Sequence, residues 1–153
     1  MPDISGSGQN LAGLADQIKW GSIMKVLIID DDPLVRYTLS KILTSHGYEV
    51  ATAVNGERGF ASLVDENPAV VITDLIMPEQ EGIETIIRIR REHPNIRIIA
   101  ISGGGRYGNF DLLPMAQSLG ADVIISKPFE AEELLGPLKR LSGMSSGPEA
   151  DAA

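Results

Sequence analysis

The sequence contains no cysteine and only two histidines. Without a thiol the chain forms no disulfide and has no cysteine nucleophile, which fits a reducing compartment, so we expect a cytoplasmic location. His46 and His93 each stand near the predicted end of a helix, where the helix dipole favours them. We therefore do not expect a site for zinc or another soft metal.

Long hydrophobic runs are also absent. The longest cover four or five residues, as in Val26–Ile29, whereas a membrane-spanning helix needs about 20. The N-terminus lacks the basic start and the apolar stretch of a secretory signal. We expect no transmembrane helix, no secretory signal and no membrane partner.

Basic residues are scarce, with 13 Lys and Arg against 21 Asp and Glu and a net charge of −8. A domain this acidic is poorly suited to contact the phosphates of a nucleic acid, so we expect no nucleic-acid partner. We interpret Arg88, Arg90 and Arg91 as a solvated helix face. A length of 153 residues, 43% of them hydrophobic, suits one domain with a real core, and we expect no separate DNA-binding module.

Three parts of the chain differ in composition. Residues 1–23 are rich in Gly, Ser, Asn and Gln, residues 24–141 carry the hydrophobic pattern, and residues 142–153 have the composition of a disordered tail. The first part is either a flexible native extension, with Leu11, Leu14 and Ile18 at helical spacing to pack on the domain or a partner, or a non-native leader. We favour the leader, with Met24 as the natural start.

The middle part alternates short apolar runs with amphipathic segments. The predicted strands are Val26–Ile29, Glu49–Ala53, Val70–Thr73, Ile98–Ile101 and Val123–Ile125. Apolar residues at helical spacing mark five helices between and after them: Val35, Leu39, Ile42 and Leu43; Phe60, Leu63 and Val64; Ile83, Ile86 and Ile87; Leu112, Met115, Ala116 and Leu119; Leu134, Leu138 and Leu141. This alternation predicts an α/β fold with a parallel, doubly wound sheet covered on both faces.

Polar side chains follow four of the five predicted strands. They are Asp30, Asp31 and Asp32 after the first strand, Asp74 after the third, Ser102 after the fourth and Lys127 after the fifth. Because sites in open parallel sheets lie beyond the carboxyl ends of the strands, we expect these side chains to share one cleft. Clustered carboxylates repel one another unless a cation lies among them, and oxygen ligands of this kind favour Mg²⁺ or Ca²⁺.

Such a cleft suits a phosphoryl group. Mg²⁺ commonly takes one or two carboxylates together with a phosphate oxygen. The Lys127 ammonium is a point charge for phosphoryl oxygens, and the Ser102 hydroxyl is a hydrogen-bond donor. A carboxylate such as Asp74 is a known nucleophile that forms an acyl phosphate.

The same segments resemble the response-regulator receiver domain of two-component signalling over residues 25–141. The matching segments are Val26 to Arg36, Val71 to Pro78 with Gly82, Ile101-Ser102, Gly120 to Asp122, and Lys127 to Phe129. The resemblance implies a flavodoxin-like (βα)5 fold with five parallel strands in the order 2-1-3-4-5. It also implies a stand-alone receiver that takes a phosphoryl group from a histidine kinase or a histidine phosphotransfer protein and signals through protein contacts.

The resemblance assigns roles by position. It makes Asp74 the phosphoacceptor, Asp30, Asp31, Asp74 and the backbone carbonyl of Ile76 the Mg²⁺ ligands, Ser102 the sensing hydroxyl and Lys127 the partner of the phosphoryl group. Asp32 is peripheral, and the Lys127–Pro128 peptide is often cis in the family. A homodimer through the surfaces of helices four to five is a further implication.

Two departures from the family pattern concern the output. Ile124 stands where the family usually has an aromatic residue. The fourth strand is followed by Gly103, Gly104 and Gly105, then by Arg106 and Tyr107. We predict that this loop and the next helix form the mobile output element, with Tyr107 or Arg106 in place of the aromatic residue.

Two other functions compete with the phosphoacceptor. One is a Mg²⁺-dependent aspartyl phosphatase with Asp74 as nucleophile, but neither a general acid nor a substrate-selecting cap is evident. The other is a binding scaffold that works without phosphorylation, for which the set of acids, hydroxyl and lysine has no use. The acidic segment Glu79-Gln80-Glu81 tunes either the affinity for the metal or the choice of kinase, and the sequence leaves both open.

Overall fold

The computed structural model describes residues 23–75, 81–103 and 113–142. Five parallel strands form one sheet in the order β2-β1-β3-β4-β5. The strands are β1 Lys25–Ile29, β2 Glu49–Ala53, β3 Val70–Asp74, β4 Arg97–Ser102 and β5 Val123–Ser126. The predicted fold class and strand order are confirmed.

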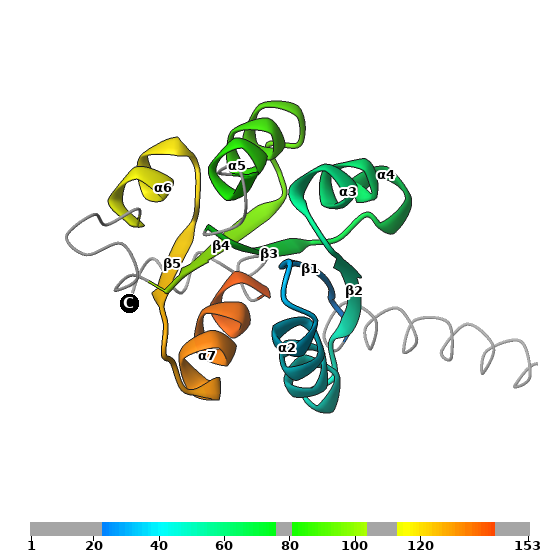
Figure 1. Ribbon diagram of the computed structural model, residues 1–153. Coiled ribbons are helices and arrows are strands. Elements are labelled where there is room, and N and C mark those ends of the chain that lie inside the picture. Colours follow the sequence, from blue (N-terminus) through cyan, green and yellow to red (C-terminus); the bar gives the residue numbers. More distant parts are fainter. Residues whose placement is uncertain (1–22, 76–80, 104–112, 143–153) are drawn as a thin grey trace, which may run out of the picture.

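Helices cover both faces of the sheet. They are α2 Pro33–Ser45, α3 Gly56–Ala61, α4 Leu63–Glu66, α5 Glu81–Glu92, α6 Leu113–Leu119 and α7 Ala131–Ser142. Figure 1 shows α2 and α7 on one face and α3, α4, α5 and α6 on the other. In the part of the chain with described coordinates, every helix is too short or too polar to cross a membrane.

Two hydrophobic clusters fill the space between the sheet and its helices. Alternate residues of β1 point to opposite faces, with Leu27 and Ile29 in one cluster and Val26 and Ile28 in the other. All four side chains are fully buried. A strand covered on both faces is apolar at every position, which is why the continuous apolar run predicts a central strand.

The second predicted helix is wrong in part. The chain forms two short helices, α3 and α4, separated by Ser62. The Ser62 N–H donates to the carbonyls of Arg58 and Gly59, and its hydroxyl donates to Gly59 as well, so the turn tightens there. Leu63 is buried against the core, whereas Val64 has 77% of its surface exposed.

The ends of strands β3 and β4 lie slightly later than predicted. Asp74 pairs with Ile101, and Ser102 pairs with Ser126, so both polar residues are the last members of their strands rather than the first residues of loops. Backbone pairing on the sheet therefore holds the main chain of both residues.

Candidate functional site

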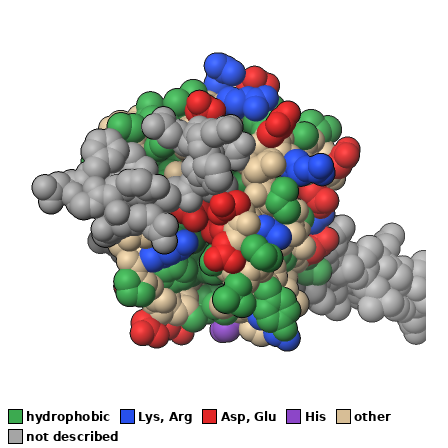
Figure 2. Space-filling model, viewed as in Figure 1, with side chains coloured by type: hydrophobic (Ala, Val, Ile, Leu, Met, Phe, Trp, Pro, Cys, Tyr) green, Lys and Arg blue, Asp and Glu red, His purple; other side chains and the backbone are tan. Residues whose placement is uncertain are grey.

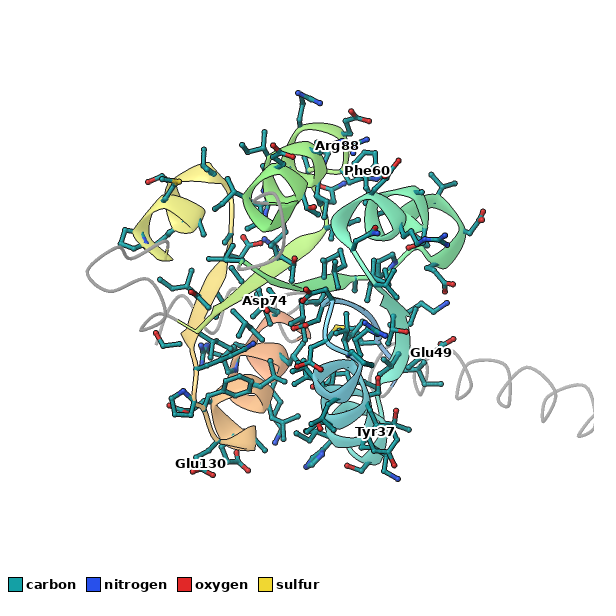
Figure 3. All side chains as sticks on the ribbon, viewed as in Figure 1. Tyr37, Glu49, Phe60, Asp74, Arg88 and Glu130 are labelled. Carbon is teal, nitrogen blue, oxygen red and sulfur yellow. The ribbon has the colours of Figure 1, made fainter. Side chains whose placement is uncertain are left out.

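The carboxyl ends of β1, β3, β4 and β5 bring the predicted site residues to one edge of the sheet. Asp30 follows β1, Asp74 and Ser102 end their strands, and Lys127 follows β5. Figure 3 labels Asp74 between the helices of the two faces. Asp30, Asp74 and Ser102 expose only 3%, 7% and 1% of their surfaces, which is unusual for polar side chains.

Three carboxylates meet at this edge. Asp30, Asp31 and Asp74 each offer one oxygen, and these oxygens all lie within 4.8 Å of one another. Figure 2 shows acidic side chains gathered near the middle of this face of the molecule. A group of oxygen donors at this spacing could hold a hard metal ion.

Asp32, the fourth predicted carboxylate, has a different place. Its side chain accepts a hydrogen bond of 2.9 Å from the N–H of Leu34 and caps the N-terminus of α2. Its own N–H donates to Oδ1 of Asp30 at 2.9 Å. Asp32 therefore starts the helix and orients the neighbouring carboxylate.

The environment of Asp30 disfavours its charged form. Burial raises the pKa of Asp30 to about 6, and the nearby carboxylates of Asp74 and Asp31 act in the same direction. The hydrogen bond from Asp32 N–H and the ammonium of Lys127 oppose the rise. A bound cation would relieve this unfavourable accumulation of charge, so the donor set fits a metal.

Lys127 follows β5 and contacts residues at the ends of β3 and β4. Its Nζ lies 3.4 Å from Oδ2 of Asp74, and its backbone N–H donates to the carbonyl of Ser102 at 2.8 Å. The Lys127–Pro128 peptide is cis. The lysine side chain is 30% exposed, so its ammonium stands between the buried carboxylate and solvent.

The backbone around Asp74 is held closely by its neighbours. Leu75 N–H donates to the carbonyl of Ile101 at 2.8 Å, and the Thr73 hydroxyl donates to the carbonyl of Asp74 at 3.2 Å. A Cβ at Gly82, in the first turn of α5, would overlap the Asp74 carbonyl oxygen and the backbone of Leu75. Only glycine lets α5 begin this close to Asp74.

The predicted output residues are only partly described. Gly103 is half-buried with open space where a side chain would stand. Ile124 is half-buried and packs against the cluster on the face of α5 and α6. Ile76, Gly104, Arg106 and Tyr107 lie outside the described residues.

Arg36 and Gly82 also shape this edge of the sheet, although the sequence predicts no role for either of them. The guanidinium of Arg36 donates to the carbonyl oxygen of Asp30 at 2.6 Å. Gly82 permits the approach of α5 described above. Both act through the backbone of an acidic residue, so a search for reactive side chains does not find them.

The match to a family model covers most of the folded part. The model described as the response regulator receiver domain matches residues 26–139. The chain is 30% identical over 122 residues to sporulation initiation phosphotransferase F of Bacillus subtilis, covering 80% of this chain and 96% of that protein. It is 35% identical over 119 residues to chemotaxis protein CheY of Thermotoga maritima, covering 77% and 97%.

Solved structures of receiver domains also superpose on this chain. A CheY-like receiver domain protein from Methanospirillum hungatei superposes with a TM-score of 0.73 at 28% identity, covering 82% of this chain and 99% of that one. The response regulator TrrA from Thermotoga maritima, solved in complex with Mg²⁺–BeF, has a TM-score of 0.67 at 30% identity, with 77% and 98% covered.

Proposed function

This chain belongs to the response regulator receiver domain family, and on that premise we propose that it accepts a phosphoryl group on Asp74 with Mg²⁺ bound beside it. The donor is a histidine kinase or a histidine phosphotransfer protein. The phosphorylated domain then signals through contacts with another protein. Its role is that of a stoichiometric acceptor and not that of an enzyme with turnover.

One observation carries this proposal. The carboxylate of Asp74 lies both 3.4 Å from the Lys127 ammonium and within the group of three carboxylate oxygens separated by at most 4.8 Å. The proposed nucleophile therefore lies beside a cation that can bind phosphoryl oxygens. It also lies beside Asp30 and Asp31, the acid pair that would bind the metal. The other ion pairs among the described residues, such as Lys25 with Glu66, lack such a combination.

Asp74, Lys127 and Ser102 would each have a separate role in the transfer of the phosphoryl group. A carboxylate oxygen of Asp74 attacks the phosphorus of the donor's phosphohistidine, an O–P bond forms, and the N–P bond breaks with its electron pair returning to the imidazole. The ammonium of Lys127, 3.4 Å from Oδ2 of Asp74, would offset the negative charge that gathers on the phosphoryl oxygens. The Ser102 hydroxyl would donate to another of these oxygens.

Asp30, Asp31, Asp74 and the backbone carbonyl of Ile76 would hold the metal. When bound, Mg²⁺ would neutralise part of the charge on the transferring group. The TrrA structure, solved in complex with Mg²⁺–BeF at 30% identity to this chain, supports Mg²⁺ as the ion. The three carboxylates here supply oxygen donors of the kind Mg²⁺ prefers.

For the output we propose that Ser102 passes the change to the loop beginning at Gly103 and to α6. Ile124, an aliphatic residue packed against the core, replaces the aromatic residue usual in the family. The substitute role of Tyr107 or Arg106 stays a prediction.

Intact-protein mass spectrometry after incubation with acetyl phosphate and Mg²⁺ tests this function. We expect one phosphoryl adduct per chain, lost in Asp74→Asn and without metal. Asp65→Asn, an exposed acid on α4, is the matched control and should label like wild type. Continuous release of phosphate, with turnover in excess of the protein, would instead indicate a phosphatase, and an absence of adduct in every condition would leave a scaffold.

A further inference from the structure

The side chain of Arg36 reaches from α2 back to the end of β1. Arg36 lies in the first turn of α2, where its N–H donates to the Asp32 carbonyl at 3.0 Å as expected for a helix. Its Nη1 donates to the carbonyl oxygen of Asp30 at 2.6 Å, across the turn between strand and helix. The hydrogen bond is charge-assisted and partly buried, which makes it stronger than a neutral one.

The bonded carbonyl belongs to the peptide between Asp30 and Asp31. A peptide unit is planar, so fixing its oxygen restrains ψ of Asp30 and φ of Asp31 together. These torsions set the directions in which the two side chains leave the backbone. One guanidinium therefore restrains both carboxylates of the acid pair.

The rest of Asp30 is held from other directions. Its N–H donates to the carbonyl of Ala53 at 3.2 Å, and its Oδ1 accepts from the N–H of Asp32 at 2.9 Å. The β-sheet thus supports the residue on its amino side. On its carboxyl side, beyond the end of β1, Arg36 supplies the hydrogen bond to the carbonyl.

We propose that Arg36 is a positioning residue for the metal: it sets the geometry of Asp30 and Asp31 without touching the ion. The inference rests on the proposed function, because it assumes that these two carboxylates bind Mg²⁺. Neighbouring groups that fix the ligands of a metal commonly matter about tenfold or more for its affinity.

Charge and geometry predict opposite effects when Arg36 is removed. A guanidinium near carboxylates repels an incoming cation, so the loss of its charge alone would tighten Mg²⁺ binding. The loss of the peptide restraint would weaken binding, because the carboxylates would have to be ordered when the ion arrives. The sign of the change therefore separates a positioning role from a purely electrostatic one.

The test compares Arg36→Met and Arg36→Lys with Arg91→Met. Lysine keeps the charge but not the fork of donors. Arg91 is an exposed arginine on α5 whose described ion pair is with its neighbour Glu92, so it controls for the loss of one charge. Mg²⁺ affinity is measured by NMR titration of amide shifts, and the melting temperature in EDTA verifies that each variant folds.

We expect both Arg36 variants to bind Mg²⁺ about tenfold more weakly, with Arg91→Met unchanged. At saturating Mg²⁺, labelling by acetyl phosphate should return to within about twofold of wild type, since only the metal step is affected. Unchanged or tighter binding in Arg36→Met, or labelling that stays low at saturating Mg²⁺, would overturn the inference alone. A wild-type chain that binds no Mg²⁺ would overturn the metal assignment of the proposed function and the inference with it.

Discussion

The ammonium of Lys127 and the carboxylate of Asp74 lie 3.4 Å apart although 53 positions separate them in the sequence. The lysine follows the edge strand β5, and the aspartate ends the central strand β3. Backbone bonds from Leu75 to Ile101 and from Lys127 to Ser102 hold the two ends in place through β4. The pair is therefore a product of the parallel sheet and not of local sequence.

Replacing Lys127 by methionine should separate phosphoryl transfer from metal binding. Without the ammonium, phosphoryl oxygens lose a nearby cation, so we expect the initial rate of acetyl phosphate labelling to fall about a hundredfold. Mg²⁺ affinity should be equal or higher, because a competing positive charge is gone. Lys41→Met, at an exposed lysine over the ring of Tyr37, should change neither quantity. A parallel loss of metal affinity in Lys127→Met would contradict the assigned role.

The stability of the metal-free chain should depend on pH through Asp30. Its pKa rises from 3.8 to about 6 on folding, mainly because of burial. Between these values the folded chain holds a proton that the unfolded chain has lost, so this group lowers the free energy of unfolding as pH rises from 3.8 through about 6. Above that range the loss is complete.

Asp30→Asn should therefore be more stable than wild type in EDTA at neutral pH, by ~1 kcal/mol or more. The asparagine oxygen can still accept from Asp32 N–H. Thermal unfolding at several pH values tests this, with Asp65→Asn as control, and the advantage should shrink as pH falls towards 3.8. A variant that is less stable than wild type at neutral pH would refute the stated environment of Asp30.

Gly82→Ala should be strongly destabilising. The added methyl would overlap the backbone of Asp74 and Leu75, and backbone cannot move aside as a flexible side chain can. We expect a loss of about 2 kcal/mol or more in the free energy of unfolding.

Gly136→Ala on α7 is the control, because the nearest atom that its added methyl would contact is Arg140 Nη1 at 3.9 Å. It should change stability by less than about 1 kcal/mol, since better helix propensity is opposed by the proline that follows. Urea unfolding of both variants gives the comparison, and equal losses would show that the approach of α5 is not the cause.

Arg90→Lys should destabilise the fold without touching the site. The guanidinium donates to the carbonyl of Gly120 through Nε and Nη2, to Asp122 at 2.7 Å and to the carbonyl of Pro94 at 2.8 Å. A lysine cannot reach all of these acceptors, so we expect a loss of about 2 kcal/mol. Arg91→Lys, exposed on the same helix, should be neutral in the same thermal unfolding experiment. Phosphoryl labelling of folded Arg90→Lys should match wild type, and a selective loss of labelling would contradict a purely structural role.

The α/β class and the shared edge of the acids could be predicted from the apolar runs and the residues that follow them, whereas the strand order was implied by the resemblance to the receiver family. Each buried strand is read as an apolar run, and the rule for parallel sheets then places Asp30, Asp74 and Lys127 at one edge. The burial of Asp74 and Ser102 as the last residues of strands needed the register of the sheet, which no local pattern contains.

The sequence did not predict the exposure of Val64 or the contact made by Arg36. The apolar spacing predicts one helix through Phe60, Leu63 and Val64. Val64 is nevertheless exposed, because Gly59 and Leu63 lie on the buried face of this stretch and Val64 lies beside that face. Arg36 ends a segment that matches the family, but the sequence predicts no role for it, because its partner is a backbone carbonyl six residues earlier, across a change from strand to helix. Side-chain contacts with the main chain carry little signal in a single sequence.

The most direct test of the central claim is to locate the phosphoryl group. After labelling with acetyl phosphate and Mg²⁺, borohydride reduces an aspartyl phosphate to homoserine, and peptide mass spectrometry then finds the altered residue. We predict homoserine at position 74 and at neither position 30 nor position 31, with none formed in Asp74→Asn. Homoserine at position 30 or 31, or unaltered aspartate at position 74 in protein that carries the adduct, would contradict the claim.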